Sequence, residues 1–303
     1  MSRSYSRSLH CTRRRALAWL GAGAAASLCP APCLAGKGPP QEFSFLVITD
    51  THVGYRGQAS AAAQWVQTAK ELTAARGDFV LHLGDIVDGG RDDQYPIYLE
   101  TRKLIGKPVH EVPGNHDPAA MFEKHIRKPI DMVLDHKGVR FLLVNNSRPD
   151  SHDGFFSAAQ LDWIDRQCGE AARKGLYVVL CSHVPVHENK HPDRGWHVKP
   201  ADGQKELYAL AARHKEQLIA MLHGHFHNGV RGWEDRGPLQ EICFPSALYN
   251  EDRKLAEQKA PGYYLAEFRP GFVQVDVKAE RLVLRYKPLG VTQTADRVCR
   301  FDA

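Results

Sequence analysis

Five short motifs rich in aspartate, histidine and asparagine occur in one order along the chain, and each follows a predicted strand. They are Asp50-Thr51-His52, Gly84-Asp85, Gly114-Asn115-His116-Asp117, Ser182-His183 and Gly224-His225-Phe226-His227. Together they supply three carboxylates, five imidazoles and one amide. This set of groups suits a centre of two divalent metal ions about 4 Å apart, which can perform a reaction as well as bind a ligand.

The spacing within the motifs agrees with metal ligation. Asp50 and His52 are two residues apart, as are His225 and His227. Residues two apart at the end of a strand can point to the same side. Asp85 carries two oxygens, so its carboxylate can bridge two ions. These residues are therefore candidate metal ligands, and His183 joins them because it occurs between the other motifs.

The segment from Asn115 to Asp117 adds groups of a different kind. The carbonyl oxygen of Asn115 can ligate a metal. The ring of His116 can carry a proton to a leaving group, and Asp117 can orient that ring. We therefore predict His116 and Asp117 as catalytic residues. Asp88 could support the same site, but we favour an interpretation as the cap of the following helix.

Strands and helices must alternate to position these motifs. Strands are predicted at residues 43–48, 79–83, 108–112, 139–144, 176–181 and 217–222, where apolar residues run almost without interruption. Helices are predicted at residues 59–76, 95–105, 119–127, 157–173 and 205–214. Ser157 and Gln160 match a capping box at the start of the fourth helix. Histidines 125, 136, 152 and 214 are placed on helices or loops, without a functional role.

The chain after the last motif reads as strands alone. They are predicted at residues 229–233, 239–242, 263–268, 272–277 and 281–285. Strand–helix alternation followed by strands predicts two packed sheets with helices outside. Ligands of such folds gather at the carboxyl ends of the strands, which is where the motifs fall.

Residues 1–35 resemble an export signal. Thr12-Arg13-Arg14-Arg15 precedes an apolar stretch, residues 16–28, that is too short to cross a bilayer as a helix. The paired arginines resemble a twin-arginine signal, and Cys33-Leu34-Ala35 predicts cleavage after Ala35. A basic start without fixed structure and an uncleaved anchor are the alternatives.

This interpretation predicts a leader over residues 1–35, a linker over residues 36–42 and a single domain over residues 43–303. The protein is expected to meet the export machinery and to reach the periplasm or the medium, with no transmembrane span in the mature chain. The five arginines of the leader account for the formal net charge of +5. The remainder is neutral overall, so no stable nucleic-acid partner is expected.

Four cysteines follow the leader: Cys168, Cys181, Cys243 and Cys299. Their spacing matches no zinc or redox pattern. We expect most of them to be buried thiols, with a bridge between Cys181 and Cys243 as the alternative in an oxidising compartment.

The five motifs in this order resemble those of the calcineurin-like metallophosphoesterase family. The likeness extends over residues 43–250, and it rests on Asp50-x-His52, Gly84-Asp85, Gly114-Asn115-His116-Asp117, His183 and Gly224-His225-x-His227. It implies an αββα sandwich, in which two mixed sheets are flanked by helices and a dinuclear metal site lies at the carboxyl ends of the strands.

The resemblance also implies two sets of metal ligands that share Asp85. The first set is Asp50, His52, Asp85 and His227. The second set is Asp85, Asn115, His183 and His225. The ions would be Mn, Fe or Zn. The implied reaction is hydrolysis of a phosphomonoester or phosphodiester by in-line attack of a hydroxide between the ions. His116 would stabilise the transition state or protonate the leaving oxygen, with Asp117 behind it.

Departures from the family's branches narrow the resemblance. Purple acid phosphatases carry a tyrosine three residues after the bridging aspartate, where this chain has Asp88. Protein Ser/Thr phosphatases carry a glutamate and an arginine where this chain has Asp117 and Gly89. The pattern is most similar to the bacterial cyclic-nucleotide phosphodiesterase-like branch, so a cyclic nucleotide or another small diester is the favoured substrate.

Substrate contacts are expected from the loop over residues 185–203 and from the segment after the last motif. We name His187, Trp196 and Tyr249 as candidates. The alternative to an exported phosphoesterase is a catalytically silent module that binds metal or a partner on the same scaffold. Loss of a ligand or of His116 would favour that alternative, and the sequence has lost neither.

Overall fold

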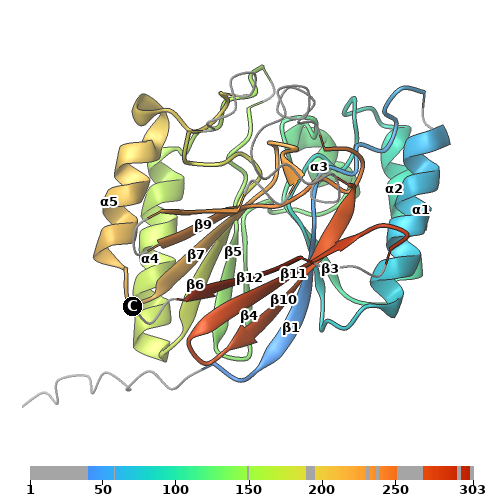
Figure 1. Cartoon of the computed structure of the whole chain (residues 1–303). Coiled ribbons are helices and arrows are strands. Elements are labelled where there is room, and N and C mark those ends of the chain that lie inside the picture. Colours follow the sequence, from blue (N-terminus) through green and yellow to red (C-terminus); the bar gives the residue numbers. More distant parts are fainter. Residues whose placement is uncertain are drawn as a thin grey trace, which may run out of the picture. The chain divides into compact units, whose positions relative to one another are not determined.

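The computed structural model describes residues 40–57, 59–148, 150–188, 195–229, 233–236, 239–250, 269–291 and 295–300 of the 303-residue chain. In the described chain, two β-sheets pack face to face and helices cover the outer face of each sheet (Figure 1). The predicted sandwich of two mixed sheets flanked by helices is confirmed.

The first sheet has the strand order β12-β11-β10-β1-β2-β3. Its parallel half contains β1 (Phe43–Ile48), β2 (Val80–His82) and β3 (Val109–Glu111). Its antiparallel half contains β10 (Gly271–Lys278), β11 (Arg281–Pro288) and β12 (Ala295–Arg300). All six residues of β1 are buried, as expected of a continuous apolar run in the middle of a sheet.

The second sheet has the strand order β4-β5-β6-β7-β9-β8. Its four central strands run parallel: β5 (Val139–Leu143), β6 (Tyr177–Cys181), β7 (Leu218–His223) and β9 (Leu239–Cys243). Its two edge strands run antiparallel to their neighbours: β4 (Met132–His136) and β8 (Trp233–Arg236). The carboxyl ends of the central parallel strands therefore lie at one edge of each sheet.

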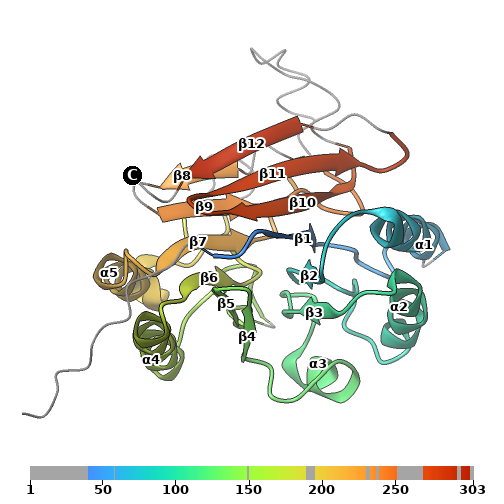
Figure 2. The ribbon, with the colours of Figure 1, turned by 90° about the horizontal axis from the view of Figure 1, so that it is seen from below.

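Figure 2 shows the four layers from below. Three apolar clusters lie between them. Phe45, Phe141 and Val275 are among the residues between the two sheets. The helices over the first sheet are α1 (Ala59–Ala74), α2 (Gln94–Arg102) with the 3₁₀ turn η1 (Lys103–Ile105), and α3 (Ala119–His125). Those over the second sheet are α4 (Ala158–Lys174) and α5 (Lys205–Arg213), which follows the π-turn η2 (Pro200–Gln204). The parallel strands of each sheet are thus covered on both faces, whereas alternate residues of β10 and β11 are only partly buried.

The start of α4 shows the predicted capping box. The Ser157 hydroxyl accepts the N–H of Gln160, and the Gln160 side chain accepts the N–H of Ser157. Gly175, with a φ of 67°, ends the helix in the left-handed conformation.

Two strands were not expected from the sequence, β4 and β12. β4 lies at a sheet edge and is only half buried, so its apolar pattern is weak. It joins β5 through Lys137 and Gly138, whose φ values of 46° and 90° suit a tight hairpin turn. His136 therefore lies on a strand, and its prediction on a helix or loop was wrong.

β8 begins at Trp233, where the predicted strand ends, and the strand predicted at 263–268 lies outside the described residues.

Cys168, Cys181 and Cys243 are buried thiols outside any disulfide. The alternative of a bridge between Cys181 and Cys243 is therefore excluded in this structure, and the Cys299 side chain lies outside the described residues.

Within the described ranges, no helix is both long enough and apolar enough to span a bilayer. The division into leader, linker and domain stays a prediction, because residues 1–39 are not described.

Candidate metal centre

The motif segments meet where β1, β2, β3, β6 and β7 end. Backbone hydrogen bonds join them: Asp50 donates its N–H to the carbonyl of Gly84 at 2.9 Å, and His52 donates to that of Asp85 at 3.0 Å. The N–H of Gly224 reaches the carbonyl of His183 at 3.0 Å. Backbone hydrogen bonds thus hold these segments, which are distant in sequence, side by side.

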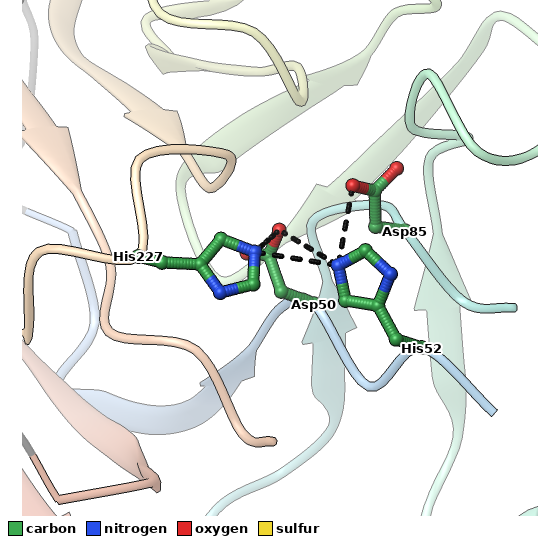
Figure 3. A group of neighbouring side chains, drawn as sticks. All are labelled: Asp50, His52, Asp85 and His227. Carbon is green, nitrogen blue, oxygen red and sulfur yellow. Dashed lines mark hydrogen bonds and ion pairs between the residues drawn. The ribbon is translucent and has the colours of Figure 1, made fainter. Parts of the chain in front are cut away.

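Asp50, His52, Asp85 and His227 form the first cluster of side chains (Figure 3). Nε2 of His227 lies 3.0 Å from Oδ1 of Asp50 and 3.3 Å from Nε2 of His52. Nε2 of His52 lies 3.4 Å from Oδ2 of Asp85. All four side chains are buried.

Asp85, His183 and His225 form the second cluster. Nε2 of His183 lies 3.2 Å from Oδ2 of Asp85 and 3.2 Å from Nδ1 of His225. The oxygen of Asp85 that contacts this cluster is the same one that contacts His52. A single carboxylate is thus shared between two groups of potential ligands, as a bridging ligand must be.

In three histidine rings, the nitrogen that points away from the cluster contacts an oxygen atom. Nδ1 of His183 donates to the carbonyl of Leu83 at 2.7 Å, and Nδ1 of His227 donates to that of Tyr249 at 2.8 Å. Nδ1 of His52 lies 3.2 Å from the Asp88 carboxylate. A proton held on Nδ1 leaves the Nε2 lone pair of each neutral ring directed into its cluster, where a cation could accept it.

Backbone strain collects at the same residues. Asp50, His52, Asp85, His225 and His227 all have φ values between 39° and 74°, in the left-handed region that residues with a Cβ seldom adopt. Each such residue costs on the order of 1–3 kcal/mol. The surrounding contacts must compensate for this strain, which is typical of a functional site.

Two motif glycines are required by close approach. A Cβ on Gly114 would lie 2.1 Å from Oδ1 of Asp85, and one on Gly224 would lie 1.9 Å from Oγ1 of Thr49. Thr49 in turn donates its hydroxyl to Asp50 at 2.6 Å. Any side chain at either glycine would therefore displace a carboxylate of the clusters.

The electrostatics show that both clusters attract positive charge. Burial lowers the pKa of His52, but hydrogen bonds with Asp50 and Asp88 outweigh burial and raise that pKa to about 10. Burial likewise lowers the pKa of His183, and the charge of Asp85 raises it to about 9. The carboxyl pKa of Asp50 is raised by burial, yet lowered further by His227, and ends well below its ordinary value.

The residues present fit two metal ions. Oδ1 of Asn115 and Nε2 of His225 are buried and have no hydrogen-bond partner, and Oδ1 of Asp50 faces histidine rings alone. Buried polar atoms without a partner are costly, and a cation would satisfy them. Carboxylate, imidazole and amide ligands suit first-row transition metals. The predicted ligands thus lie together, although their coordination of metal stays a prediction.

The surroundings of His116 differ from those expected. Asp117 does not orient its ring, because the Asp117 carboxylate accepts the N–H groups of Ile86, Val87 and Gly114 at 2.9–3.1 Å. Instead, Nδ1 of His116 contacts the carbonyl of Asp88 at 2.5 Å. Asp117 therefore shapes the two motif loops, and its predicted catalytic role is not supported by contact.

Asp88 belongs to the site. Its carboxylate lies 3.2 Å from Nδ1 of His52 and 4.0 Å from Nδ1 of His116. The N-cap of α2 is Asp93, so the favoured interpretation of Asp88 as a helix cap was wrong. No local pattern distinguishes the two roles, because the partner rings come from other loops.

The three candidate substrate contacts lie in different surroundings. The Trp196 ring centroid is 5.8 Å from that of His225, and the Tyr249 centroid is 4.4 Å from that of His227. Both aromatic rings therefore border the clusters. His187 is buried, and its Nδ1 lies 3.0 Å from the Glu241 carboxylate. A contact between His187 and substrate has no support from this position.

His152 lies at the site, although no role was predicted for it from the sequence. Its Nδ1 accepts a hydrogen bond from Nδ2 of Asn115 at 3.1 Å. Its ring centroid is 6.1 Å from those of His116 and His225. The loop that carries it has no motif, so no signal in a single sequence could identify it.

A pocket of about 420 Å³ opens beside His116. It is lined by Asp88, Gly89, Asn115, His116, Pro118, Asp150, Ser151 and His152. Within the described chain, neither Lys nor Arg is among these lining residues. The described lining thus offers two carboxylates and two imidazoles, and neither Lys nor Arg, to a molecule that binds next to the clusters.

Comparison with known proteins identifies the class. The model of the calcineurin-like phosphoesterase family matches residues 43–229. The chain therefore belongs to the calcineurin-like phosphoesterase family, and it is a metal-dependent hydrolase of phosphoric esters. The family expected from the motifs is confirmed.

Relatives with curated names are distant. A protein of Arcobacter nitrofigilis named "Probable glycerophosphodiester phosphodiesterase" is 26% identical over 199 residues, which cover 59% of this chain and 70% of that protein. A 3′,5′-cyclic-nucleotide phosphodiesterase of Nostoc sp. is 26% identical over 239 residues, which cover 73% of this chain and 86% of that protein.

Solved structures share the fold. A dimetal phosphatase from Danio rerio aligns with a TM-score of 0.64 at 17% identity, over 87% of this chain and all of that chain. A purple acid phosphatase from yellow lupin seeds aligns with a TM-score of 0.62 at 14% identity, over 85% of this chain and 53% of that chain. A likeness at identities this low shows a shared fold and does not indicate the substrate.

Proposed function

We propose that this chain hydrolyses a small phosphodiester, with a cyclic nucleotide or a glycerophosphodiester as substrate. The observation that carries the proposal is the pocket beside His116, which holds Asp88 and Asp150 and no Lys or Arg. A phosphodiester carries one negative charge, whereas a phosphomonoester carries nearly two at neutral pH. Carboxylates near the pocket repel the second charge, so they favour the diester.

The names of the relatives support a diester and leave its alcohol open. One is named for glycerophosphodiesters and another for 3′,5′-cyclic nucleotides. The pocket volume of about 420 Å³ is sufficient for a small alcohol or a nucleoside. The two substrate classes therefore have to be separated by experiment.

In the proposed site, Asp50, His52 and His227 hold one ion, and Asn115, His183 and His225 hold the other. Asp85 contacts both groups. When bound, two divalent cations lower the pKa of water and neutralise charge on the phosphoryl oxygens. Mn, Fe and Zn are the candidates, since the ligands combine imidazole with carboxylate.

His116 supplies the proton for the leaving oxygen in this proposal. Nδ1 of His116 donates to the Asp88 carbonyl, which holds the ring, so the ring must carry a second proton, on Nε2, to act as the acid. His116 also lines the pocket, and its side chain is 31% exposed, so a substrate can reach it. The alternative of a silent module is disfavoured, because both clusters are complete.

The test compares a bis-aryl phosphodiester with the matching aryl phosphomonoester. Chelator-stripped protein is supplied with Mn, Fe, Zn or Mg, and kcat/KM is measured for both esters, then for cyclic nucleotides and glycerophosphodiesters. We expect the diester to be favoured by about tenfold or more, which corresponds to roughly 1.4 kcal/mol of charge repulsion.

Asp150→Asn tests the reason for that preference. Asp150 is exposed, so its replacement should leave the fold intact, and monoester hydrolysis should rise relative to diester hydrolysis. Asp162→Asn on α4, outside the pocket, is the matched control. A wild-type protein that prefers the monoester, or an Asp150→Asn variant with an unchanged ratio, contradicts the proposal.

A further inference from the structure

The hydrogen bond between Asn115 and His152 determines which end of an amide faces the metal centre. Nδ2 of Asn115 can only donate, so Nδ1 of His152 must accept at 3.1 Å. The neutral ring of His152 then carries its proton on Nε2. In this arrangement the nitrogen of the amide faces His152 and its oxygen faces away from it.

The other end of that amide is the oxygen, Oδ1. It is buried and has no hydrogen-bond partner. An amide turned by 180° would present an NH₂ group instead, and an NH₂ group has no lone pair for a cation. The contact with His152 therefore selects the only orientation in which Asn115 can ligate a metal.

Two loops hold His152 in place. The ring of Trp196 lies 4.5 Å from it, centroid to centroid, and at 30° to its plane. Next to His152, the Asp153 carboxylate accepts the N–H of His197 at 3.1 Å and lies 3.3 Å from Nζ of Lys199. The loop between β5 and α4 is thus fastened to the segment before η2.

We propose that His152 is a positioning residue, which orients the Asn115 amide so that its oxygen can ligate the second metal ion. The inference rests on the proposed two-metal function and adds a residue that belongs to none of the five motifs. His152 acts through Asn115 and does not itself ligate the metal. Trp196 supports His152 by packing against its ring.

Two substitutions separate the acceptor atom from the bulk of the side chain. In His152→Asn, the new side-chain oxygen replaces Nδ1 as an acceptor. In His152→Leu, a side chain of similar volume has no acceptor. His136→Leu, on β4 and paired with Asp78, is the matched control for loss of a histidine.

The readout is metal binding rather than turnover. Chelator-stripped protein is titrated with Zn²⁺ in a calorimeter, and bound metal is counted by elemental analysis. We expect one of the two metal sites in His152→Leu, the site that includes Asn115, to lose about 10–100-fold in affinity. This is the typical range for residues that orient a metal ligand. His152→Asn should stay within about threefold of wild type, and the other site should be unchanged in every variant.

The outcomes are distinct. If His152→Leu binds two ions with wild-type affinities, His152 has no positioning role. If His152→Asn is as weak as His152→Leu, the acceptor atom is not the cause and the inference is overturned. If the wild-type protein binds fewer than two ions, the proposed two-metal function itself fails, which this experiment shows before any variant is compared.

Discussion

Asp85 is the residue on which the two halves of the centre depend. Its Oδ2 contacts both His52 and His183, while its Oδ1 accepts the N–H of His116 at 2.9 Å. Burial raises the pKa of this carboxyl, but the charges of His183 and His52 lower it well below its ordinary value. The carboxylate is therefore charged at neutral pH, and it can bridge two cations.

Asp85→Asn should lose both metal ions together. Asparagine keeps the shape of the side chain and removes the charge that both clusters share, so neither cation is neutralised. Elemental analysis after dialysis should find two ions in the wild-type protein and almost none in the variant. Asp165→Asn on α4 replaces a carboxylate outside the clusters and should keep both. Two tightly held ions in Asp85→Asn would rule out a bridging role.

His116→Ala should lower kcat by about 10²- to 10⁴-fold and leave the metal content unchanged, because proton donation is lost while the ligands stay. The loss should be smaller for a nitrophenyl ester, since nitrophenolate leaves without a proton. The comparison uses steady-state kinetics with aryl esters of rising leaving-group pKa. His125→Ala, whose ring pairs with Asp92, is the control. A variant with wild-type turnover on every ester contradicts the acid role.

At the scale of the elements, a buried carboxylate on β9 supports the loop that follows β6. Oε1 of Glu241 accepts the N–H groups of Val186 and His187 at 2.9 and 2.8 Å, and Oε2 accepts the hydroxyl of Tyr208 at 2.9 Å. His223, at the end of β7, lies 3.5 Å from the same carboxylate. The segments that carry two candidate ligands are thus tied to a third strand and to α5.

Glu241→Gln should reduce the free energy of unfolding by about 1–3 kcal/mol, because an NH₂ group that replaces one carboxylate oxygen cannot accept the hydrogen bonds of the buried groups around it. Burial raises the pKa of Glu241, but hydrogen bonds with His187 and His223 lower it below its ordinary value of 4.5. A carboxyl whose pKa is lower in the folded than in the unfolded protein stabilises the fold above pH 4.5. This stabilisation is lost as the pH falls below that value.

Urea unfolding of metal-free protein between pH 3 and pH 8 measures both effects. The wild-type protein should lose stability below about pH 4.5 more steeply than Glu241→Gln does. Glu206→Gln, near the start of α5, is the control for the loss of a carboxylate. Equal stability of Glu241→Gln and wild type at pH 7 would show that the carboxylate contributes nothing to the loop.

At the scale of the whole molecule, the packing of the two sheets accounts for the position of the site. The sandwich brings the ends of the parallel strands of both sheets to one edge, and the clusters lie there. We propose that residues 1–35 direct export through the twin-arginine route to the periplasm. The paired arginines, the apolar stretch and the small-x-small pattern support this proposal.

Replacing Arg13 and Arg14 together by Lys should abolish export, because a twin-arginine route recognises the pair and not the charge alone. Cell fractionation and immunoblotting should find the variant in the cytoplasm and the wild-type protein, shortened by its leader, in the periplasm. Replacing Arg3 and Arg7 by Lys is the control. Equal distribution of both proteins would contradict the proposed route.

Local patterns in the sequence were sufficient for much of the fold. Buried central strands such as β1 and β6 show continuous apolar runs, and α4 carries its own start and stop signals. These features depend on neighbouring residues, so a single sequence reveals them. β4 was missed because an edge strand needs only one partner and carries a weaker apolar pattern.

The order and types of the motif residues were determined by the sequence, and with them the family and the shared role predicted for Asp85. Only the tertiary structure decided that Asp88, and not Asp117, contacts His116, and that His152 and Glu241 reach the ligand-bearing loops. Such contacts join residues between 28 and 55 positions apart. Packing of the two sheets sets the distances between those loops. A local sequence pattern therefore cannot predict these contacts.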